Sequence, residues 1–387
     1  MKLYKKIYAV LSTFLLIACG CSNNSSQTTY TSGNKTSSTE QYAKYFSIEN
    51  HDSTVKHLTI KSSWTSNGQT EEKYLLVPRD SATLLANNPN AIPYPIKSVV
   101  CMSSSHVAYF AALNQEHCIK GISGTRFIYN EKVQELIKSH QIEDVGSETL
   151  PDYERIIYMK PDIVIAYQIN NSNNSYVSKL QKFGIKVLTI GEYLENSPLG
   201  KTEYLKLFGE LTGCRALADS IFNKTEKTYM EIKNKIAQSN KATDKVKVIM
   251  NVPYKGAWYI PGDNNYISQL VKDAGGIVLG AKENEVQSAQ LNFEHVYGYA
   301  LQADVWLHTN ALNTVKEICG EHHLLKNIPA LTNGRTYNNT LRHTAHGGSD
   351  FWETGAVEPH IILQDLAAIF HPELYGNQDL KYYRQIK

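Results

Sequence analysis

Short apolar runs alternate with amphipathic stretches along most of the chain. In the first half the apolar, strand-like runs lie at 98–101, 118–122, 163–166 and 186–190. The stretches between them have helical spacing and lie at 104–115, 131–139 and 173–183. A second alternation begins at 245–250 and ends in a helix at 358–370. Short apolar strands that alternate with helices are typical of parallel sheets covered on both faces, so the pattern predicts two doubly wound α/β lobes.

The stretch between the two alternations has a different pattern. From Lys201 to about Gln238, apolar residues recur at helical spacing, with one weak break at Leu211-Thr212-Gly213. A continuous helix of about 35 residues would span on the order of 50 Å and act as a rigid strut between the lobes. Two separate helices are the alternative. We therefore expect an N-terminal lobe at 48–200, one interlobe helix at 201–240 and a C-terminal lobe at 241–387, with an extra hairpin at 55–78.

One short pattern occurs twice, about 140 residues apart. Tyr153-Glu154-Arg155-Ile156 is matched by Phe293-Glu294-His295-Val296. Each copy continues into a helical run, then an Asp (Asp162 or Asp304), then an apolar strand. We expect two similar lobes that each present one Glu at matching places. The alternative is that both acids only sit in first helical turns, where the helix dipole favours them.

The first residues have the pattern of a secretory signal. A basic start precedes a short apolar run, and the run ends at Leu16-Ile17-Ala18-Cys19. This ending resembles a bacterial lipoprotein cleavage box, which implies a signal peptide at 1–18 and a lipidated Cys19. Cys21 as the acylated residue and a plain signal peptide are the alternatives. The polar stretch 19–47 reads as a flexible tether, so we expect a membrane-anchored, extracytoplasmic protein without a spanning helix.

Composition narrows the function further. At 387 residues the chain is long enough for two domains. The formal net charge is +2 and no Lys/Arg-rich block follows the signal, so a nucleic-acid partner is not expected. Four later cysteines form no C-x-x-C pair: Cys101, Cys118, Cys214 and Cys319. A disulfide between Cys101 and Cys118 is one alternative, and buried free thiols are the favoured one.

No catalytic motif stands out. The sequence has no G-x-S-x-G elbow, no P-loop and no dinucleotide fingerprint, so we expect no enzyme; an extracytoplasmic hydrolase is the alternative from another class. The histidines are not spaced as a zinc site, and we expect no bound metal of that kind. A haem ligand among His106, His343 and His346 stays open, because one or two axial residues suffice.

Several stretches together resemble the ferric-siderophore and cobalamin binding proteins of bacterial ABC importers. They are the first copy of the repeat with Lys160-Pro161-Asp162, the segment Leu207-Phe208-Gly209-Glu210-Leu211-Thr212-Gly213, Trp258-Tyr259-Ile260-Pro261-Gly262, and the closing Glu358-Pro359-His360 helix. The resemblance covers about Lys97 to Leu374 and excludes the hairpin. It implies two lobes with a ligand cleft, no covalent cofactor, a monomer, and docking of Glu154 and Glu294 on the ABC permease. The second copy departs from the pattern, because its Asp comes two residues later and lacks the preceding Pro.

The loops that follow the predicted strands carry the candidate ligand residues, because ligands of open parallel sheets bind beyond the carboxyl ends of the strands. Arg126 and Arg342 are predicted to pair with anionic ligand groups. Aromatic walls are predicted from Phe127, Tyr129, Trp258, Tyr259 and Trp352, and Ser105, His106 and Tyr167 lie in the same loops. Each of these side chains also suits a structural role. The ligand that this set favours is a metal chelate, either a ferric siderophore or cobalamin, with haem as the alternative in the same fold.

Overall fold

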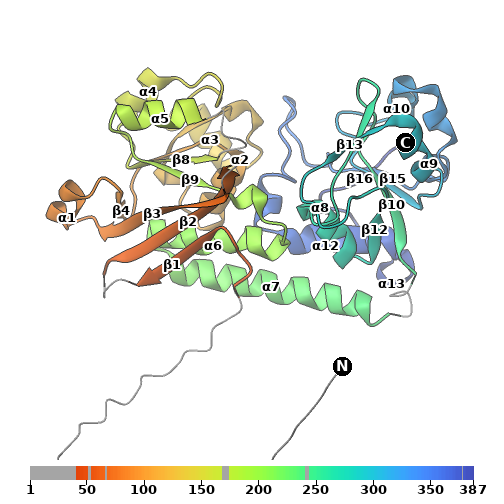
Figure 1. Cartoon of the computed structure of the whole chain (residues 1–387), viewed down its shortest axis with the longest axis horizontal. Coiled ribbons are helices and arrows are strands. Elements are labelled where there is room, and N and C mark those ends of the chain that lie inside the picture. The colour runs from red at the N-terminus through yellow and green to blue at the C-terminus, as the bar shows by residue number, and fades with distance from the viewer. Residues whose placement is uncertain (1–40, 51–53, 66–67, 168–173, 240–243, 377) are drawn as a thin grey trace, which may run out of the picture. The chain divides into compact units, whose positions relative to one another are not determined.

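The computed structural model of the chain describes residues 41–50, 54–65, 68–167, 174–239, 244–376 and 378–387 (Figure 1). Residues Gln41–Lys387 form one compact unit. The predicted signal peptide, Cys19 and most of the predicted tether lie outside the described residues. Within the described residues, no helix is both long enough and apolar enough to cross a membrane.

The N-terminal lobe contains a five-stranded parallel sheet in the order β7-β6-β5-β8-β9. The strands are β5 (Val99–Cys101), β6 (Ile119–Ile122), β7 (Glu143–Asp144), β8 (Ile163–Tyr167) and β9 (Val187–Ile190). Alternate residues enter two different cores: Ile163 and Ile165 pack with α2 (Ser104–Ala112), and Val164 and Ala166 pack with α4 (Tyr153–Met159) and α5 (Asn174–Lys182). Burial on both faces explains why these strands read as continuous apolar runs. Helix α3 (Glu131–Lys138) contributes Val133 to the α2 side.

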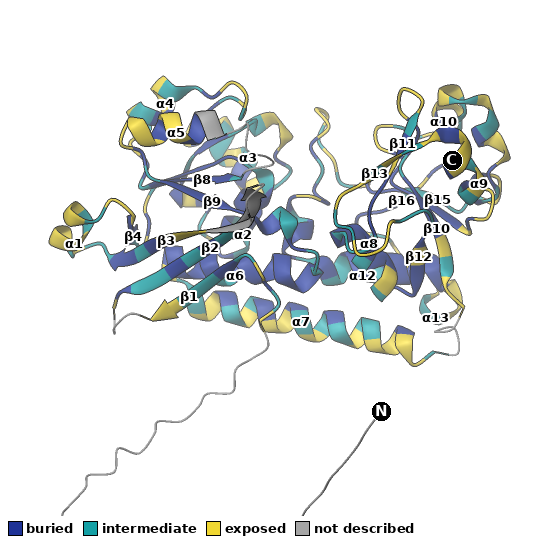
Figure 2. Cartoon of the chain, in the orientation of Figure 1, coloured by how far each residue is buried: buried dark blue, intermediate teal, exposed yellow. Residues whose placement is uncertain are grey.

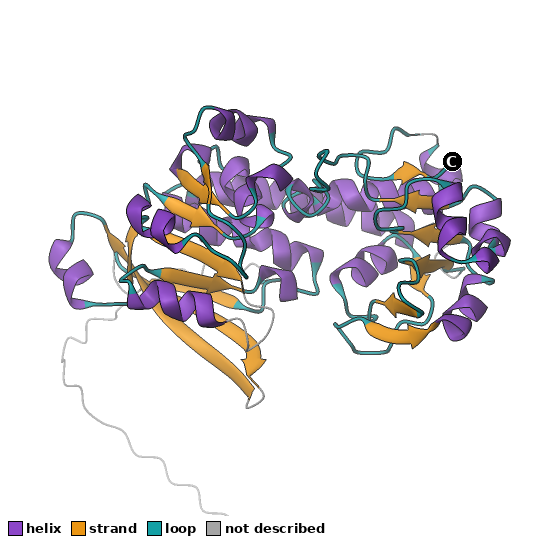
Figure 3. Cartoon of the chain, turned by 90° about the horizontal axis from the view of Figure 1, so that it is seen from above, coloured by secondary structure: helices purple, strands orange, loops and turns teal. Residues whose placement is uncertain are grey.

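The C-terminal lobe repeats this plan with a sheet in the order β12-β10-β14-β15-β16. The strands are β10 (Val246–Met250), β12 (Gly276–Val278), β14 (Val305–Leu307), β15 (Thr336–Asn338) and the antiparallel β16 (Arg384–Gln385). A separate antiparallel pair is formed by β11 (Ala257–Ile260) and β13 (Ala289–Asn292). The helices are α8 (Tyr266–Asp273), α9 (Phe293–Ala300), α10 (Val315–Glu321), α11 (Pro329–Thr332), α12 (Pro359–Phe370) and α13 (Pro372–Tyr375). The predicted fold class of two doubly wound α/β lobes is confirmed; Figure 3 shows both sheets from above.

An added four-stranded sheet precedes the first lobe. Its order is β1-β2-β3-β4, with β1 (Phe46–Asn50), β2 (Lys56–Thr65), β3 (Gly68–Pro78) and β4 (Ala91–Tyr94); α1 (Ala82–Asn87) lies between the last two. The predicted hairpin is β2 and β3, but the turn expected at Ser66-Asn67-Gly68 lies partly outside the described residues. Arg79, just after β3, pairs with Asp162 at 2.6 Å and so ties the added sheet to the parallel one.

The single interlobe helix predicted for 201–240 is wrong. Two helices, α6 (Pro198–Thr212) and α7 (Arg215–Ala237), meet at Gly213, which caps α6 with φ 73°. A Cβ atom added to Gly209 would lie 2.6 Å from the Ala218 Cβ, so α7 folds back tightly along α6. The predicted break was therefore real: Gly accepts a left-handed cap that other residues resist.

Helix α7 carries the chain from the first lobe to the second. Its 23 residues span about 34 Å. Ala218 belongs to the core of the first lobe and Tyr229 to the core of the second, while the opposite side of the helix is exposed (Figure 2). The apolar spacing that predicted a strut therefore describes one amphipathic helix that borders both cores.

The first described residues lie across the junction of the lobes. Tyr42 packs against the core of the second lobe and Ala43 belongs to the core of the first. Their backbone N–H groups donate to Glu203 of α6, both at 2.8 Å, and the N–H groups of Lys44 and Tyr45 donate to Glu195, at 2.8 and 3.0 Å. We call residues 42–45 the junction strap. Two buried carboxylates thus hold it by four backbone hydrogen bonds.

The repeated sequence pattern has a shared structural basis. Asp162 accepts hydrogen bonds from the backbone of Lys97 and Ser98, at 2.7 and 3.1 Å, just before β5. Asp304 accepts one from Lys247 in β10 at 2.8 Å. Each Asp thus fixes the strand that follows it against the neighbouring first strand of its lobe's parallel sheet, β5 or β10. The cysteines Cys101 and Cys118 are buried free thiols, not a disulfide.

Candidate functional site

A pocket of about 560 Å³ lies at the carboxyl edge of the first lobe's sheet. Its lining comes from the loops after four strands: Met102, Ser103 and Ser104 after β5, Ser123, Gly124, Arg126, Phe127 and Ile128 after β6, Asp144, Gly146 and Ser147 at β7, and Tyr167 at the end of β8. β5 and β8 are neighbours at the point where the strand order reverses. Ligands of doubly wound sheets bind at this topological switch point.

Arg126 and Phe127 stand at the rim of this pocket on a rigid turn. Gly124 has φ 70°, which starts the turn, and Thr125 donates its backbone N–H and its hydroxyl to Asp144 at 2.8 and 2.9 Å. The Arg126 guanidinium lies 4.7 Å from the centre of the Phe127 ring, and Phe127 is 38% exposed. Within the described part of the chain, no carboxylate pairs with Arg126, so its charge faces the pocket unneutralised.

The floor of the pocket continues into a buried polar chain. The Ser103 and Ser105 hydroxyls are 2.8 Å apart, and Ser105 donates to Glu192 at 2.7 Å. Burial opposes ionisation of Glu192, but His106, Lys201 and Ser105 outweigh it and lower its pKa to about 2. Ser105 is only 4% exposed and His106 is not exposed at all. Neither of these two predicted ligand residues lines the pocket, and the burial of His106 leaves no surface at which a haem iron could bind it.

A loop of the second lobe, residues 342–353, closes over the first. The Thr344 hydroxyl donates to the Arg126 carbonyl at 3.3 Å, and Gly348 lies so close to Phe127 that a Cβ atom there would be 1.9 Å from the Phe127 carbonyl oxygen. Glu353, fully buried, accepts hydrogen bonds from the backbone of Tyr129 and Asn130 at 2.8 and 2.9 Å. We call residues 342–353 the crossing loop. The sequence analysis missed Glu353, because its backbone partners lie more than 200 residues away along the chain.

Arg342 is engaged within this loop. Its guanidinium pairs with the buried Asp350 at 2.8 Å and lies 5.2 Å from the Tyr129 ring centre and 5.3 Å from that of Tyr382. Its charge is therefore already matched. Arg342 and Tyr129 line a separate cavity of about 470 Å³ on the border of the lobes. The structure thus does not bring Arg342 together with Arg126 as a second free cation.

The three predicted aromatic residues of the second lobe have different environments. Trp258 has no exposed surface and donates its indole N–H to the Met250 carbonyl at 2.8 Å, so it is a core residue and the ligand-wall prediction is wrong for this conformation. Tyr259, the next residue on β11, is 41% exposed. Adjacent residues of a strand face opposite sides, so the two rings never share one wall. Trp352 is 43% exposed and lies edge-on to His308, at the carboxyl end of β14.

Three histidines near the carboxyl edge of the second sheet differ in burial. His308 is buried beside Tyr383, to which its Nε2 is hydrogen-bonded at 2.7 Å, and burial lowers its pKa to about 3, so it is neutral. His343 and His346 are exposed on the crossing loop. Among the residues with described positions, no three His, Cys, Asp or Glu side chains gather as a metal site.

Both predicted docking acids are exposed at equivalent helical positions. Glu154 and Glu294 are the second residues of α4 and α9, after N-caps Asp152 and Asn292 whose side chains accept from the backbone N–H three residues on. Glu294 also lines a small cavity of about 230 Å³ with Phe293, Glu321 and His322. In Figure 1 both helices lie on the side away from α7.

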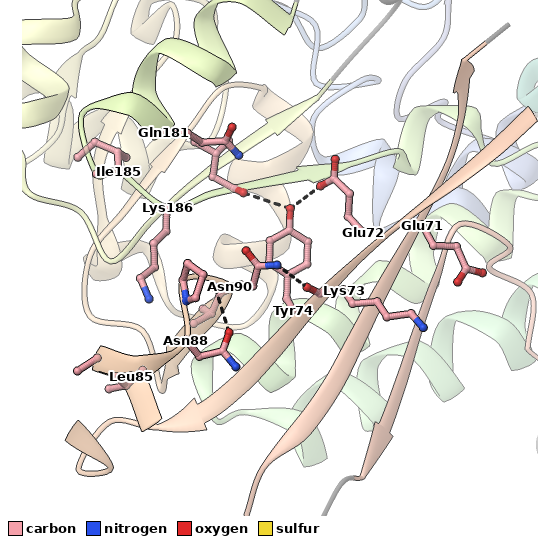
Figure 4. Close-up of a pocket in the computed structure, with 15 residues that line it drawn as sticks. Glu71, Glu72, Lys73, Tyr74, Leu85, Asn88, Asn90, Gln181, Ile185 and Lys186 are labelled. Carbon is pink, nitrogen blue, oxygen red and sulfur yellow. Dashed lines mark hydrogen bonds between the residues drawn. The ribbon is translucent and has the colours of Figure 1, made fainter. Parts of the chain in front are cut away.

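A larger cavity, about 700 Å³, lies between the added sheet and the first lobe (Figure 4). The Tyr74 hydroxyl is hydrogen-bonded to Glu72 at 2.5 Å and lies 3.3 Å from the Val187 carbonyl. Val187 is the first residue of β9, so this cavity adjoins the amino end of that strand. The carboxyl edge is where sheets of this class bind ligands, and we therefore take the smaller pocket as the candidate site.

Two doubly wound lobes joined by one helix, with a pocket at a switch point, define a two-lobed solute-binding protein. A sequence model of the periplasmic binding protein family matches residues 99–339, and the chain belongs to that family. The match leaves out the added sheet and α12.

A relative and two solved structures are similar to most of the chain. An uncharacterised lipoprotein of Methanocaldococcus jannaschii is 27% identical over 330 residues, which cover 81% of this chain and 76% of the relative. The fold resembles a periplasmic haem binding protein of Pseudomonas aeruginosa (TM-score 0.55, 18% identity, 76% of this chain and 98% of that one). It also resembles the triscatecholate siderophore binding protein of Bacillus subtilis in complex with ferri-bacillibactin (TM-score 0.53, 17% identity, 72% and 94%).

Proposed function

We propose that this protein captures an anionic metal chelate of the ferric-siderophore class and delivers it to the permease of an ABC importer. The observation that carries the proposal is the pocket at the switch point of the first lobe, with the unpaired Arg126 at its rim. A volume of about 560 Å³ lies within the usual range for small-molecule sites. The ligands named for the two similar structures, a ferric triscatecholate and haem, are both iron complexes.

The charge of the pocket distinguishes among the candidate ligands. Arg126 and the first turn of α2, capped by Ser103, supply positive charge and N–H groups that suit an anion. Phe127 and the exposed Trp352 offer aromatic surface on opposite lobes. This combination favours an anionic ferric siderophore over cobalamin. Haem is the second candidate, because His343 and His346 are exposed on the crossing loop beside the pocket.

Fluorescence titration tests the ligand assignment. The panel is a ferric triscatecholate, a ferric hydroxamate, cobalamin and haem, each titrated against the mature chain. We expect saturable quenching by the anionic ferric chelate, most of it lost in Trp352→Phe. Arg126→Ala should weaken its binding about tenfold, as expected for one lost ion pair in a desolvated site. Lys224→Ala removes one exposed positive charge on α7 and is the matched control. Equal affinity of Arg126→Ala and wild type would refute the site.

We also propose that Glu154 and Glu294 dock the two lobes on the permease. One exposed ion pair contributes about 0–1 kcal/mol, but two acids on separate lobes of one body fix register and speed encounter. The pair Glu154→Lys/Glu294→Lys should abolish the stimulation of the importer's ATP hydrolysis and leave ligand affinity unchanged. A loss of ligand affinity in that double variant would contradict the docking assignment.

The proposal of a membrane anchor rests on the sequence around Cys19 and on the name of one relative. The Leu-x-Ala-Cys ending marks Cys19, and the M. jannaschii relative is named a lipoprotein. Metabolic labelling with a radioactive fatty acid should label the wild type and Cys21→Ser but not Cys19→Ser. Label that persists in Cys19→Ser and disappears in Cys21→Ser would move the anchor to Cys21.

A further inference from the structure

The most exposed large apolar side chains of the described chain lie in and just before α4. Tyr158 is 87% exposed and Leu150 is 80% exposed. Leu150 is held by a tight turn, because its backbone N–H donates to the Ser147 carbonyl at 3.1 Å and its carbonyl accepts from Ser147 at 3.2 Å. A side chain with so little contact contributes little to folding. Contiguous exposed apolar surface marks interaction sites, whereas single exposed apolar residues are common, so the neighbours of these side chains decide their meaning.

Tyr158 shares a helix face with Glu154. The two residues are four apart in α4, which places them one turn apart on the same side. Ile156 points the other way into the core. The acid and the aromatic ring therefore form one continuous surface, which we call the α4 face.

The second lobe has the acid without the ring. In the aligned copy Glu294 corresponds to Glu154, and the position of Tyr158 is occupied by Gly298. A Cβ atom at Gly298 would meet no heavy atom within 4 Å, and Gly298 carries no left-handed φ, so packing does not require a glycine there. Leu301, the C-cap residue of α9, is 43% exposed and comes seven positions after Glu294. The difference between the copies thus is not imposed by the fold of the lobe.

We infer that the α4 face docks in an apolar recess of the permease and that Tyr158 is its aromatic anchor, whereas the second lobe docks through Glu294 without such an anchor. This inference rests on the proposed docking function. The occupant is the permease because the ring adjoins the acid assigned to it on one helix face. Tyr buries a flat apolar surface with a polar tip and is enriched among residues that dominate interface energy.

The experiment measures vanadate-sensitive ATP hydrolysis stimulated by the ligand-loaded chain. The importer is supplied in nanodiscs made from membranes of cells that lack this chain. We expect Tyr158→Ser to raise the half-saturating concentration about tenfold, and to do so equally at high salt, because apolar contacts are not screened. Tyr158→Phe should keep most of the wild-type response. Leu217→Ser is the control, since Leu217 is 39% exposed on α7, on the opposite side of the molecule.

Four outcomes would overturn all or part of the inference. Unchanged stimulation by Tyr158→Ser, with loss in Glu154→Lys/Glu294→Lys, overturns the anchor and keeps the proposed docking; unchanged stimulation by both variants overturns the docking itself. Gly298→Tyr added to Tyr158→Ser should not restore stimulation, and restoration would show that any exposed ring suffices. Analytical ultracentrifugation covers the alternative occupant: a dimer that Tyr158→Ser dissolves would assign the α4 face to a second copy of the chain.

Discussion

At the scale of single residues, two buried carboxylates fasten segments that are distant in sequence. Glu195 holds the junction strap, and Glu353 holds the start of α3 from the opposite lobe. Burial raises the pKa of each side chain to about 7, although the backbone N–H groups favour the ionised form. The same carboxyl groups have a pKa of 4.5 in the unfolded chain. Between about pH 4.5 and 7, both are therefore protonated in the folded protein and ionised in the unfolded chain.

These pKa values predict a stability that depends on pH. A carboxyl group whose folded pKa is raised stabilises the fold fully below its unfolded pKa, and this contribution is lost as the pH rises through about 7. We expect the free energy of unfolding to fall by on the order of 1–3 kcal/mol per group between about pH 5 and 8. Glu195→Gln and Glu353→Gln, which mimic the neutral acid, should each flatten this slope in denaturant titrations.

Glu192 supplies the contrast for that measurement. Its pKa is lowered, so its contribution is lost only as the pH falls below 4.5 toward about 2, outside the tested window. Glu192→Gln should therefore leave the slope between about pH 5 and 8 as it is in the wild type. His308 contributes with the opposite sign in part of this window, because burial lowers its pKa, so the comparison is between each variant and the wild type. Slopes that Glu195→Gln and Glu353→Gln leave unchanged would contradict the assignment of the raised values.

Residue-level prediction from the sequence succeeded where exposure follows from the local pattern. Glu154 and Glu294 are each the second residue of a helix, and the residue two positions later is buried. Because residues two apart face different sides of a helix, each Glu lies on the exposed side. Trp258 and Tyr259 were predicted to form one wall, but strand alternation separates them. The carboxylates Glu192 and Glu353 were missed because their partners come from sequence positions about 90 and 220 residues away.

At the scale of secondary structure, the reversal between α6 and α7 fixes how the lobes are joined. Gly213 donates its backbone N–H to the last turn of α6, and Cys214 donates to the Gly209 carbonyl at 2.7 Å. A Cβ atom at Gly213 would lie 3.3 Å from Pro95 of the loop after β4. The turn is therefore constrained by its backbone conformation and by its neighbour.

Gly213→Ala is expected to destabilise the protein. The left-handed φ of 73° costs an L-residue about 1–2 kcal/mol, and contact with Pro95 adds to it. Gly184→Ala is the matched control, since Gly184 has φ 78° but open space around a Cβ atom. Guanidinium unfolding should show the larger loss for Gly213→Ala. An equal loss in the two variants would show that the contact with Pro95 is immaterial.

Most helices and strands of the two lobes were predictable because the spacing of apolar residues within each segment follows its own secondary structure. The predicted strand 163–166 is β8, and the predicted helix 358–370 is α12. The long-helix prediction failed at Gly213 because apolar residues on both sides of the break share one helical phase. Short edge strands such as β7 and β16, of two residues each, carry too few positions to show a period.

At the scale of the whole molecule, the two lobes use related but different strand orders. The first sheet reads 3-2-1-4-5 in its own chain order and the second reads 2-1-3-4-5. Alternation along the sequence predicted two lobes, yet it carries no information on strand order or on the crossing loop. The sequence predicted which loops could form the candidate pocket. Only the strand order of the sheet shows which of those loops converge.

The junction strap determines where tension on the preceding chain would act on the folded protein. The chain before Gln41 leads directly into the junction strap, whose backbone N–H groups donate to Glu195 and Glu203. Tyr42 of the strap also donates its hydroxyl to Glu226 of α7 at 2.7 Å. If that preceding chain tethers the protein to a membrane, as proposed, tension on it would reach both lobes at once, because the strap contacts the core of each.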